Sequence, residues 1–272
     1  MAAHLARIGA IVTVAALAVV YPFLPGEHDS LAVPLSTMAQ ACGVFGLPLV
    51  PIGILWLVFP ARGYRFALAA VIVASFVAIA LSIVGFAMVG RSLGIPMLVL
   101  CVCIVFRLRR RLKQTEAGGF HPAALYLAIV PVALLLFQLA VAVPMTERSR
   151  SRAMTNSAEL IGDIEAYKTR NGRFPQALFG LHKDYSPSVI GVERFHYAPQ
   201  GDAYHLYFEQ PRFVLDRLGT QELVVYNGRD EQLMVGHTAR ILDQPPERLV
   251  NAQGWYEAQE ASSPHWKSFF FD

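Results

Sequence analysis

Residues 122–175 constrain this chain most, because the two halves of this stretch suit two different solvents. Residues 122–144 are apolar and include no charged side chain, and about 20 such residues form a helix that spans a lipid bilayer. Residues 145–171 place charged side chains among apolar ones at helical spacing, and the pattern stops at Asn171-Gly172. We therefore expect a transmembrane helix that continues into an amphipathic helix of a water-soluble domain.

The distribution of charge agrees with this division. Residues 1–144 carry nine Lys/Arg and three Asp/Glu, whereas residues 145–272 carry fourteen and seventeen. The resulting net charges of +6 and −3 indicate one half in lipid and one half in water. The basic residues of the first half lie beside apolar segments, so the positive balance predicts contact with a lipid bilayer and no nucleic-acid partner.

Five segments are apolar and long enough to be predicted spans. They are Leu5–Leu24, Thr37–Phe59, Phe66–Val89, the shorter Leu93–Leu108, and Pro122–Pro144. The first begins with Arg7 and could be a signal peptide, but no small-x-small cleavage site follows its apolar centre, which favours an uncleaved anchor. The predicted fold is a bundle of five transmembrane helices followed by an α+β domain. The divisions are a four-span region (1–121), the fifth helix (122–144) and the soluble domain (145–272).

Small residues and prolines predict how the spans pack. Pro48 and Pro51 should bend the second span. Its three glycines should let another helix approach closely; they are Gly43, Gly46 and Gly53. The third span carries small side chains four residues apart, a face suited to tight packing; these are Ala70, Ala74, Ala78 and Ser82.

The loops between the spans predict their orientation. Five Lys/Arg lie between Arg107 and His121, whereas residues 26–36 carry two acidic residues and no Lys/Arg. Positively charged loops stay in the cytoplasm, so we expect a cytoplasmic N-terminus and an external domain after the fifth span. Three arginines just after that span, Arg148, Arg150 and Arg152, oppose this orientation, but long domains are translocated largely regardless of such charge.

The soluble half begins with an amphipathic helix. Its predicted apolar stripe consists of Met154, Ser157, Ala158, Ile161, Ile164 and Lys168, widened by Leu160 and Tyr167. Gly172 supplies a left-handed terminating residue, and residues 175–181 can form a short helix. Alternation then predicts two hairpins, 194–198 with 203–209 and 222–226 with 232–235. We also expect a short strand at 213–215, and irregular structure or short elements from 241 to 272 that dock through aromatic side chains.

The segment Ala158–Leu178, with Tyr167 and the run Asn171-Gly172-Arg173-Phe174-Pro175, resembles the end of the first helix in type IV pilins and type II secretion pseudopilins. In that family a membrane helix continues into a periplasmic helix and packs on a small antiparallel sheet. The resemblance covers roughly residues 122–236. It implies a pilin-like domain in the bacterial periplasm, anchored in the inner membrane. Four spans precede this helix and no prepilin-peptidase site stands before it, so it implies the shape of a domain rather than a pilus.

Few side chains suggest chemistry. The candidate polar or interaction residues are Gln138, His182, Asp184, His196 and His205. We favour a hydrogen bond to a neighbouring helix for Gln138. His196 and His205 lie on paired strands and could share a metal, but zinc sites use at least three protein ligands, so structural histidines are favoured. Asn227–Glu231 could hold calcium, although a simple turn is favoured. Cys101 and Cys103 do not share a helix face, so apolar packing is favoured.

These observations predict a non-catalytic bacterial inner-membrane protein. No catalytic residue, metal or cofactor is predicted, because the sequence contains no serine-nucleophile motif, phosphate loop or His-Glu-x-x-His. The centres of the spans carry no ionisable residue, which counts against a pump or coupled transporter. The expected role is to present a periplasmic domain for binding or assembly with a protein partner of the envelope or periplasm. A membrane enzyme or lipid-handling protein with a site where bundle and domain meet is the first alternative, and a passive solute pathway is the second.

Overall fold

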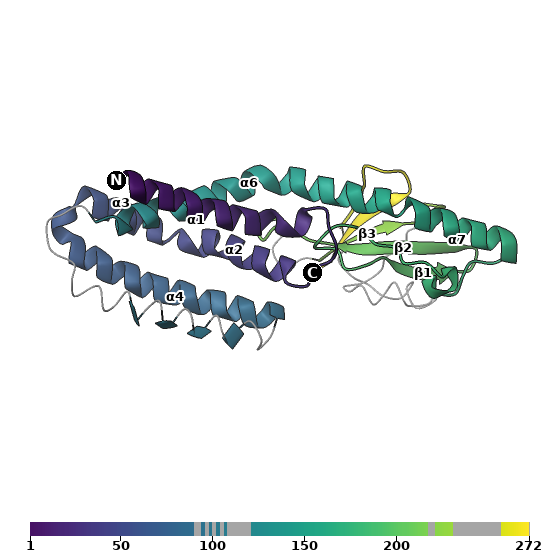
Figure 1. The fold of residues 1–272 in the computed structure, drawn as a ribbon, viewed down its shortest axis with the longest axis horizontal. Coiled ribbons are helices and arrows are strands. Elements are labelled where there is room, and N and C mark those ends of the chain that lie inside the picture. Colours follow the sequence, from purple (N-terminus) through teal and green to yellow (C-terminus); the bar gives the residue numbers. More distant parts are fainter. Residues whose placement is uncertain are drawn as a thin grey trace. The chain divides into compact units, whose positions relative to one another are not determined.

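The structure is a computed structural model of residues 1–272. It describes residues 1–89, 121–216, 221–230 and 257–271, together with the pairs 94–95, 98–99, 102–103 and 106–107. The chain forms two compact units (Figure 1). Unit 1 contains residues 1–20 and 33–141, and unit 2 contains residues 21–32 and 142–272.

Unit 1 is helical. Its helices are α1 (Ala2–Val20), α2 (Ala32–Gly46), α3 (Leu49–Val58), α4 (Gly63–Val89) and the first part of α6 (Ala123–Asn156). Within the described residues, three helical segments are long and apolar enough to cross a membrane: Ala2–Phe23, Pro60–Ala87 and Ala123–Asn171. The pair α2–α3 makes a fourth if it counts as one span. Half of the predicted span Leu93–Leu108 lies outside the described residues, so the prediction of five spans is supported only in part.

The predicted bend in the second span is confirmed. Helices α2 and α3 meet at 50° across residues 47–48. Pro48 is the residue before α3, and Pro51 lies in the first turn of α3, where the missing N–H group of a proline costs little. The two prolines therefore allow one apolar segment to change direction without breaking either helix.

The glycines of α2 and α3 lie against α6, as expected for close helix approach. A methyl group added at Gly53 would lie 2.7 Å from the Ala124 carbonyl oxygen and 2.9 Å from the Ala128 nitrogen. Gly43 and Gly46 face Gln138 and Pro131 in the same way. Because lipid offers no hydrophobic drive for association, such backbone proximity is what stabilises these helix pairs.

A chain of hydrogen bonds also joins three helices of unit 1. The side-chain amide of Gln138 on α6 donates to the Gln40 carbonyl on α2 at 3.1 Å. The Gln40 amide donates to Ser36 at 2.9 Å, and the Ser36 hydroxyl donates to the Val19 carbonyl on α1 at 2.6 Å. Gln138 therefore makes the helix–helix hydrogen bond that its position favoured. Along α4, Ala70 and Ser82 are buried and Ala74 and Ala78 are half-buried, so the small-residue face packs inward.

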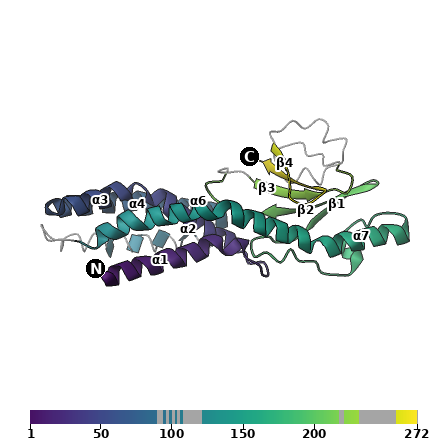
Figure 2. The ribbon, with the colours of Figure 1, turned by 90° about the horizontal axis from the view of Figure 1, so that it is seen from above.

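Unit 2 places a helix along one face of an antiparallel sheet (Figure 2). The helical layer is the end of α6 followed by α7 (Ala158–Asn171). The described strands run in the order β1-β2-β3-β5-β4. Their bounds are β1 (His196–Gln200), β2 (Ala203–Gln210), β3 (Gln221–Tyr226), β4 (Glu257–Glu260) and β5 (Trp266–Phe271). The coarse α+β prediction, a long helix beside a small antiparallel sheet, is confirmed.

The helical layer is nearly continuous. Helix α6 runs through Pro144 and is separated from α7 only by Ser157. The predicted terminator is confirmed, because Gly172 is left-handed (φ 71°) and donates its N–H to the Lys168 carbonyl. The predicted stripe needs one correction. Ala158 is exposed, whereas the predicted stripe residues Leu160 and Ile164 are fully buried, because the inward line follows 153, 157, 160 and 164.

Both faces of the sheet are buried. Leu206, Phe208, Val224 and Trp266 form one core with Leu160 and Ile164 of α7. Alternate residues of the same strands form a second core on the opposite face. Its members are Ala198, Tyr207, Leu223, Val225 and Phe269. Alternation along each strand therefore serves two apolar surfaces.

The first predicted hairpin is confirmed, since β1 pairs with β2 around Gly201. The second is not found as predicted. Strand β3 pairs with β2 on one edge and with β5 on the other, and residues 232–235 lie outside the described residues. Of the two forms expected for residues 241–272, short elements are found at 257–260 and 266–271, which are strands, and Trp266 and Phe269 dock in the two cores. Residues 213–215 form no strand, and the short helix is a 3₁₀ turn, η3 (Leu178–Leu181).

The loop after α1 belongs to unit 2, which the sequence did not predict. Residues Tyr21–Phe23 form a 3₁₀ turn (η1), and Phe23 stacks on Phe213 with ring centres 4.5 Å apart. The Ile190 and Gly191 amides donate to the carbonyls of Leu24 and Pro22. Residues 21–32 thus fold together with residues 142–272 in one unit.

We expect Gly53→Ala to destabilise unit 1, because the added methyl would press on the α6 backbone. Overpacking of this kind typically costs about 1–3 kcal/mol. The measurement is thermal unfolding of the purified protein in detergent. Gly9→Ala in α1 is the matched control, since nothing lies within 4 Å of its added methyl. Equal melting temperatures for the two variants would show that α3 and α6 do not pack closely.

Candidate functional site

A surface groove of about 350 Å³ lies between the last turns of α7 and the loop that follows it. We call it the α7 groove. Its walls are formed by Asp163, Tyr167, Arg170 and Asn171 from the helix and by Gly180, Leu181, His182 and Lys183 from the loop. The groove forms here because Gly172 ends the helix and turns the chain back along it. It combines aromatic, cationic and anionic side chains in one concave surface.

Lys183 holds the loop against the helix. Its ammonium group donates to Glu159 at 2.9 Å and to Asp163 at 2.8 Å, and the Tyr185 hydroxyl donates to the same Asp163 oxygen at 2.7 Å. The hydrogen bonds from Lys183 and then Tyr185 lower the pKa of Asp163, and the bonds to Asp163 and Glu159 raise the pKa of Lys183. Partial burial, followed by the bond to Asp163, raises the pKa of Tyr185 to about 12. The loop is thus fixed by charge as well as by packing.

Phe179 projects into solvent beside this groove. Its side chain is 88% exposed, although its neighbours Leu178 and Leu181 pack against the apolar core. It lies on η3, whose end is set by the left-handed His182 (φ 57°), and its ring makes an edge contact with the His182 ring. Scattered surface apolar residues are ordinary, but a fully exposed phenyl ring held on a short fixed turn beside a groove is typical of contact surfaces.

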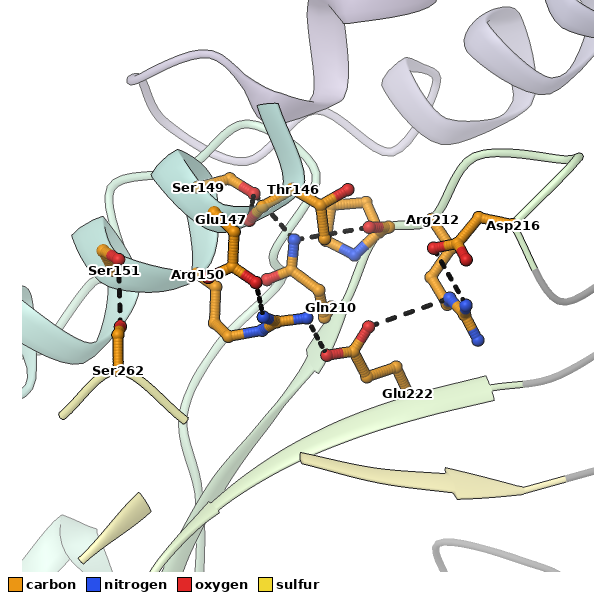
Figure 3. Close-up of polar contacts among 11 residues, drawn as sticks. Thr146, Glu147, Ser149, Arg150, Ser151, Gln210, Arg212, Asp216, Glu222 and Ser262 are labelled. Atoms are coloured by element: carbon orange, nitrogen blue, oxygen red, sulfur yellow. Dashed lines mark hydrogen bonds and ion pairs between the residues drawn. The ribbon is translucent and has the colours of Figure 1, made fainter. Parts of the chain in front are cut away.

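A second polar region lies where α6 meets the sheet (Figure 3). Arg150 of α6 donates to Glu147 on its own helix and to Glu222 of β3. Glu222 also lies 3.7 Å from Arg212, which pairs with Asp216 at 3.0 Å. These residues form a chain of alternating charge around a cavity of about 160 Å³, which we call the α6 cavity.

The register of the sheet explains this position. Glu222 lies opposite Gln210 and Phe270 in neighbouring strands, so these three form one row on the face covered by helix. Gln210 donates to Ser149 of α6 at 2.7 Å. The helix-facing side of the sheet is therefore apolar at its centre and polar along this row.

The structure separates the residues predicted from sequence. His182 lines the α7 groove, and Asp184 is exposed in the same loop without lining it. His196 stacks on Tyr207, with ring centres 5.0 Å apart. His205 is buried, 3.3 Å from the Asn227 amide. Gln138 belongs to unit 1.

Neither proposed metal site is assembled in the described part of the chain. His196 lies opposite Tyr207, which is two positions from His205, so the two histidines share a sheet face. The His196 ring stacks on Tyr207, whereas the His205 ring lies beside the Asn227 amide. Among the described residues no group of three or more His, Cys, Asp or Glu could hold a metal. At the possible calcium turn, the Asn227 side-chain oxygen accepts the Arg229 amide and Asp230 pairs with His265. Glu231 lies outside the described residues.

Sequence reasoning missed Phe179 and the Arg150–Glu222–Arg212 group. A charged residue opening the apolar strand 222–226 was a usable signal for Glu222, since that position faces inward in an alternating strand. No local pattern distinguishes an exposed phenylalanine from a buried one. Comparison with protein-family models, curated proteins and solved structures finds no match to this chain, so the pilin-like resemblance remains a prediction.

The lowered pKa of Asp163 predicts a pH-dependent loop. A carboxyl whose pKa is lowered on folding stabilises the folded state above its ordinary value of 3.8, and this contribution is lost as pH falls through the lowered value. We expect Lys183→Met to raise the Asp163 pKa toward that ordinary value, as measured by NMR titration of the aspartate carboxyl carbons. Lys267→Met, which removes a distant pair with Glu260, should leave it unchanged. An unaltered Asp163 titration in Lys183→Met would contradict the assigned cause.

Proposed function

We propose that this protein is a membrane-anchored, non-catalytic binding protein whose unit 2 recognises another protein through the α7 groove. The observation that carries the proposal is Phe179, an 88% exposed aromatic ring held on a fixed turn beside that groove. Exposing this ring to water is unfavourable, and covering it with a partner removes that cost. Buried aromatic residues of this kind dominate the binding energy of many protein interfaces.

Charge around Phe179 suggests the chemistry of the partner. Arg170 and Arg173 are exposed near the same end of α7, while Lys183 is already paired with Glu159 and Asp163. Two exposed arginines at the end of α7, one of them lining the groove, together with the exposed ring suit a partner surface with an apolar pocket and an acidic rim. Arginine is favoured at such sites because its planar group binds carboxylates through paired hydrogen bonds.

We place the protein in a bacterial inner membrane, with a cytoplasmic N-terminus and unit 2 in the periplasm. The basic loop at residues 107–113 supports this orientation. The docking of residues 21–32 within unit 2 supports one part of this arrangement, because the loop after α1 and the C-terminal domain must then lie on the same side of the membrane, opposite the N-terminus. The fold also uses two of the three opposing arginines, since Arg150 pairs with Glu222 and Arg152 donates to the Ser188 carbonyl.

The shared side limits the number of spans. Between residues 32 and 142 the chain must cross the membrane an even number of times. Helices α2–α3, α4 and α6 supply three candidate crossings among the described residues. The predicted span Leu93–Leu108 makes the number four, which supports five spans in total. If α2–α3 were a re-entrant pair instead, only three spans would be needed.

Phe179→Ser should abolish partner binding without unfolding the protein, because the ring contributes almost nothing to the core. Tagged full-length protein is purified from native membranes after reversible crosslinking, and co-purified proteins are quantified by mass spectrometry. A central aromatic typically contributes 2 kcal/mol or more, so a specific partner should fall by roughly tenfold or more. Leu215→Ser, which changes an exposed apolar residue outside the groove, is the control and should retain that partner. Identical partner profiles for the two variants would refute the proposal.

The topology is tested by labelling with a membrane-impermeant maleimide in a background without Cys42, Cys101 and Cys103. The single-cysteine variants Glu27→Cys and Arg194→Cys should both react with the maleimide from the periplasmic side in intact spheroplasts. A reporter fused after Leu108 should be cytoplasmic. Labelling of the Glu27→Cys and Arg194→Cys variants from opposite sides of the membrane would be incompatible with the docked loop and with the proposed orientation.

A further inference from the structure

The buried charges around the α6 cavity do not cancel. Two guanidinium groups lie inside, since Arg150 is buried and the Arg212 side chain is only 9% exposed. Glu222 is the buried carboxylate between them, with a side chain 1% exposed. The other two carboxylates, Glu147 and Asp216, have side chains 48% and 45% exposed and lie at the rim. The buried side chains of this cluster therefore carry a net charge of +1, and the half-exposed Glu147 and Asp216, each paired with one of the arginines, bring the charge of all five residues to −1.

Two hydrogen-bond donors of the cavity wall are left unsatisfied. Within the described residues, the Thr146 hydroxyl and the Arg150 Nε atom are buried and have no hydrogen-bond partner. Buried donors without partners are costly, and native proteins satisfy nearly all of them with protein, water or ligand. The cavity volume of about 160 Å³ has room for several waters or one small polar group. A group that accepts hydrogen bonds would satisfy these donors, and an anionic one could take the place of a rim carboxylate beside the two buried guanidinium groups.

The rim carboxylates do not prevent this occupation. Ion pairs that involve half-exposed carboxylates contribute only about 0–1 kcal/mol, because water screens them and the side chains lose freedom on pairing. Glu147 and Asp216 can therefore rotate toward solvent at little cost. An anion in their place would receive charge-assisted hydrogen bonds from guanidinium groups that are already fixed by Glu222, so little ordering is needed on binding.

We propose that the α6 cavity is an anion-binding site that takes a carboxylate or phosphate group, held by Arg150, Arg212 and Thr146. Val143 and Phe270 form its apolar wall, which admits the carbon portion of a ligand next to the anionic group. The source of the group is either a small soluble anion or a phospholipid headgroup, since both present the same phosphate chemistry. This site is separate from the α7 groove and does not depend on the proposed protein partner.

The test uses full-length protein in detergent, titrated with inorganic phosphate at constant ionic strength while thermal unfolding is followed. A ligand that binds only the folded state raises the melting temperature along a saturable curve. Thr146→Val should keep the fold, because it removes a hydroxyl with no protein partner among the described residues. It should weaken the apparent phosphate affinity roughly three- to tenfold, the effect of one lost hydrogen bond. Thr155→Val, an exposed threonine on the same helix, is the matched control and should titrate like the wild type.

Repeating the titration in lipid nanodiscs identifies the source. If a headgroup occupies the cavity, added phosphate produces no further stabilisation in nanodiscs, and Thr146→Val alone melts at a lower temperature there than the control. If the natural ligand is soluble, the saturable response persists in nanodiscs. A non-saturable rise that is equal in wild type, Thr146→Val and Thr155→Val would be a general salt effect on burial and would overturn the proposal.

Discussion

One helical layer has to satisfy two environments along its length, and the rest of the structure depends on how it does so. The first part of α6 is bound by backbone proximity, with Gly53 against Ala124 and Ala128, and by the Gln138 hydrogen bond. The last part of α6 exchanges these contacts for charged ones through Arg150. Helix α7 then relies on ordinary apolar burial of Leu160 and Ile164. Each stretch uses the interaction that its own surroundings make strongest.

The Arg150–Glu222 pair fixes the helical layer on the sheet in one register. Apolar contacts such as those of Leu160 tolerate sliding and rotation, because the hydrophobic effect has no direction. A buried guanidinium must meet its carboxylate with correct geometry, and removing one partner of such a pair costs about 3–5 kcal/mol because the other is left charged and dry. Gln210 and Ser149 add a second directional contact in the same row. Polar contacts at one end thus orient a layer that is stabilised mainly by apolar burial.

The sequence predicts those features that depend on neighbouring residues. The β1–β2 hairpin, the bend near Pro48 and the helix end at Gly172 each follow from a few adjacent residues with restricted backbone conformations. The pairing of β3 with β5 joins residues about forty positions apart, and no local pattern specifies which distant strand occupies an edge. The stripe of α7 was predicted correctly at Leu160 and Ile164 and wrongly at Ala158, which lies outside the inward direction that those two residues set.

The candidate surfaces were harder to predict than the fold. His182 lines the α7 groove, so the sequence correctly indicated the loop after α7 as part of a candidate surface. The exposure of Phe179 depends on how the 3₁₀ turn is anchored by Leu178 and Leu181, which is a tertiary property. The α6 cavity depends on three segments, at residues 143–150, 210–222 and 259–270, whose proximity only the folded sheet creates.

The docking of residues 21–32 within unit 2 constrains the order in which the chain can fold during its synthesis. Leu24 emerges from the ribosome 166 residues before Ile190, and the Leu24 carbonyl accepts a hydrogen bond from the Ile190 amide. At about 5–20 residues per second, this interval is roughly ten to thirty seconds. During that time the loop between α1 and α2 has no partner, and β5 (Trp266–Phe271) follows later still. Unit 2 can therefore close only once β5 has been made, and a nascent chain that stops before Ile190 would leave the early loop without its hydrogen-bond partners and open to proteases.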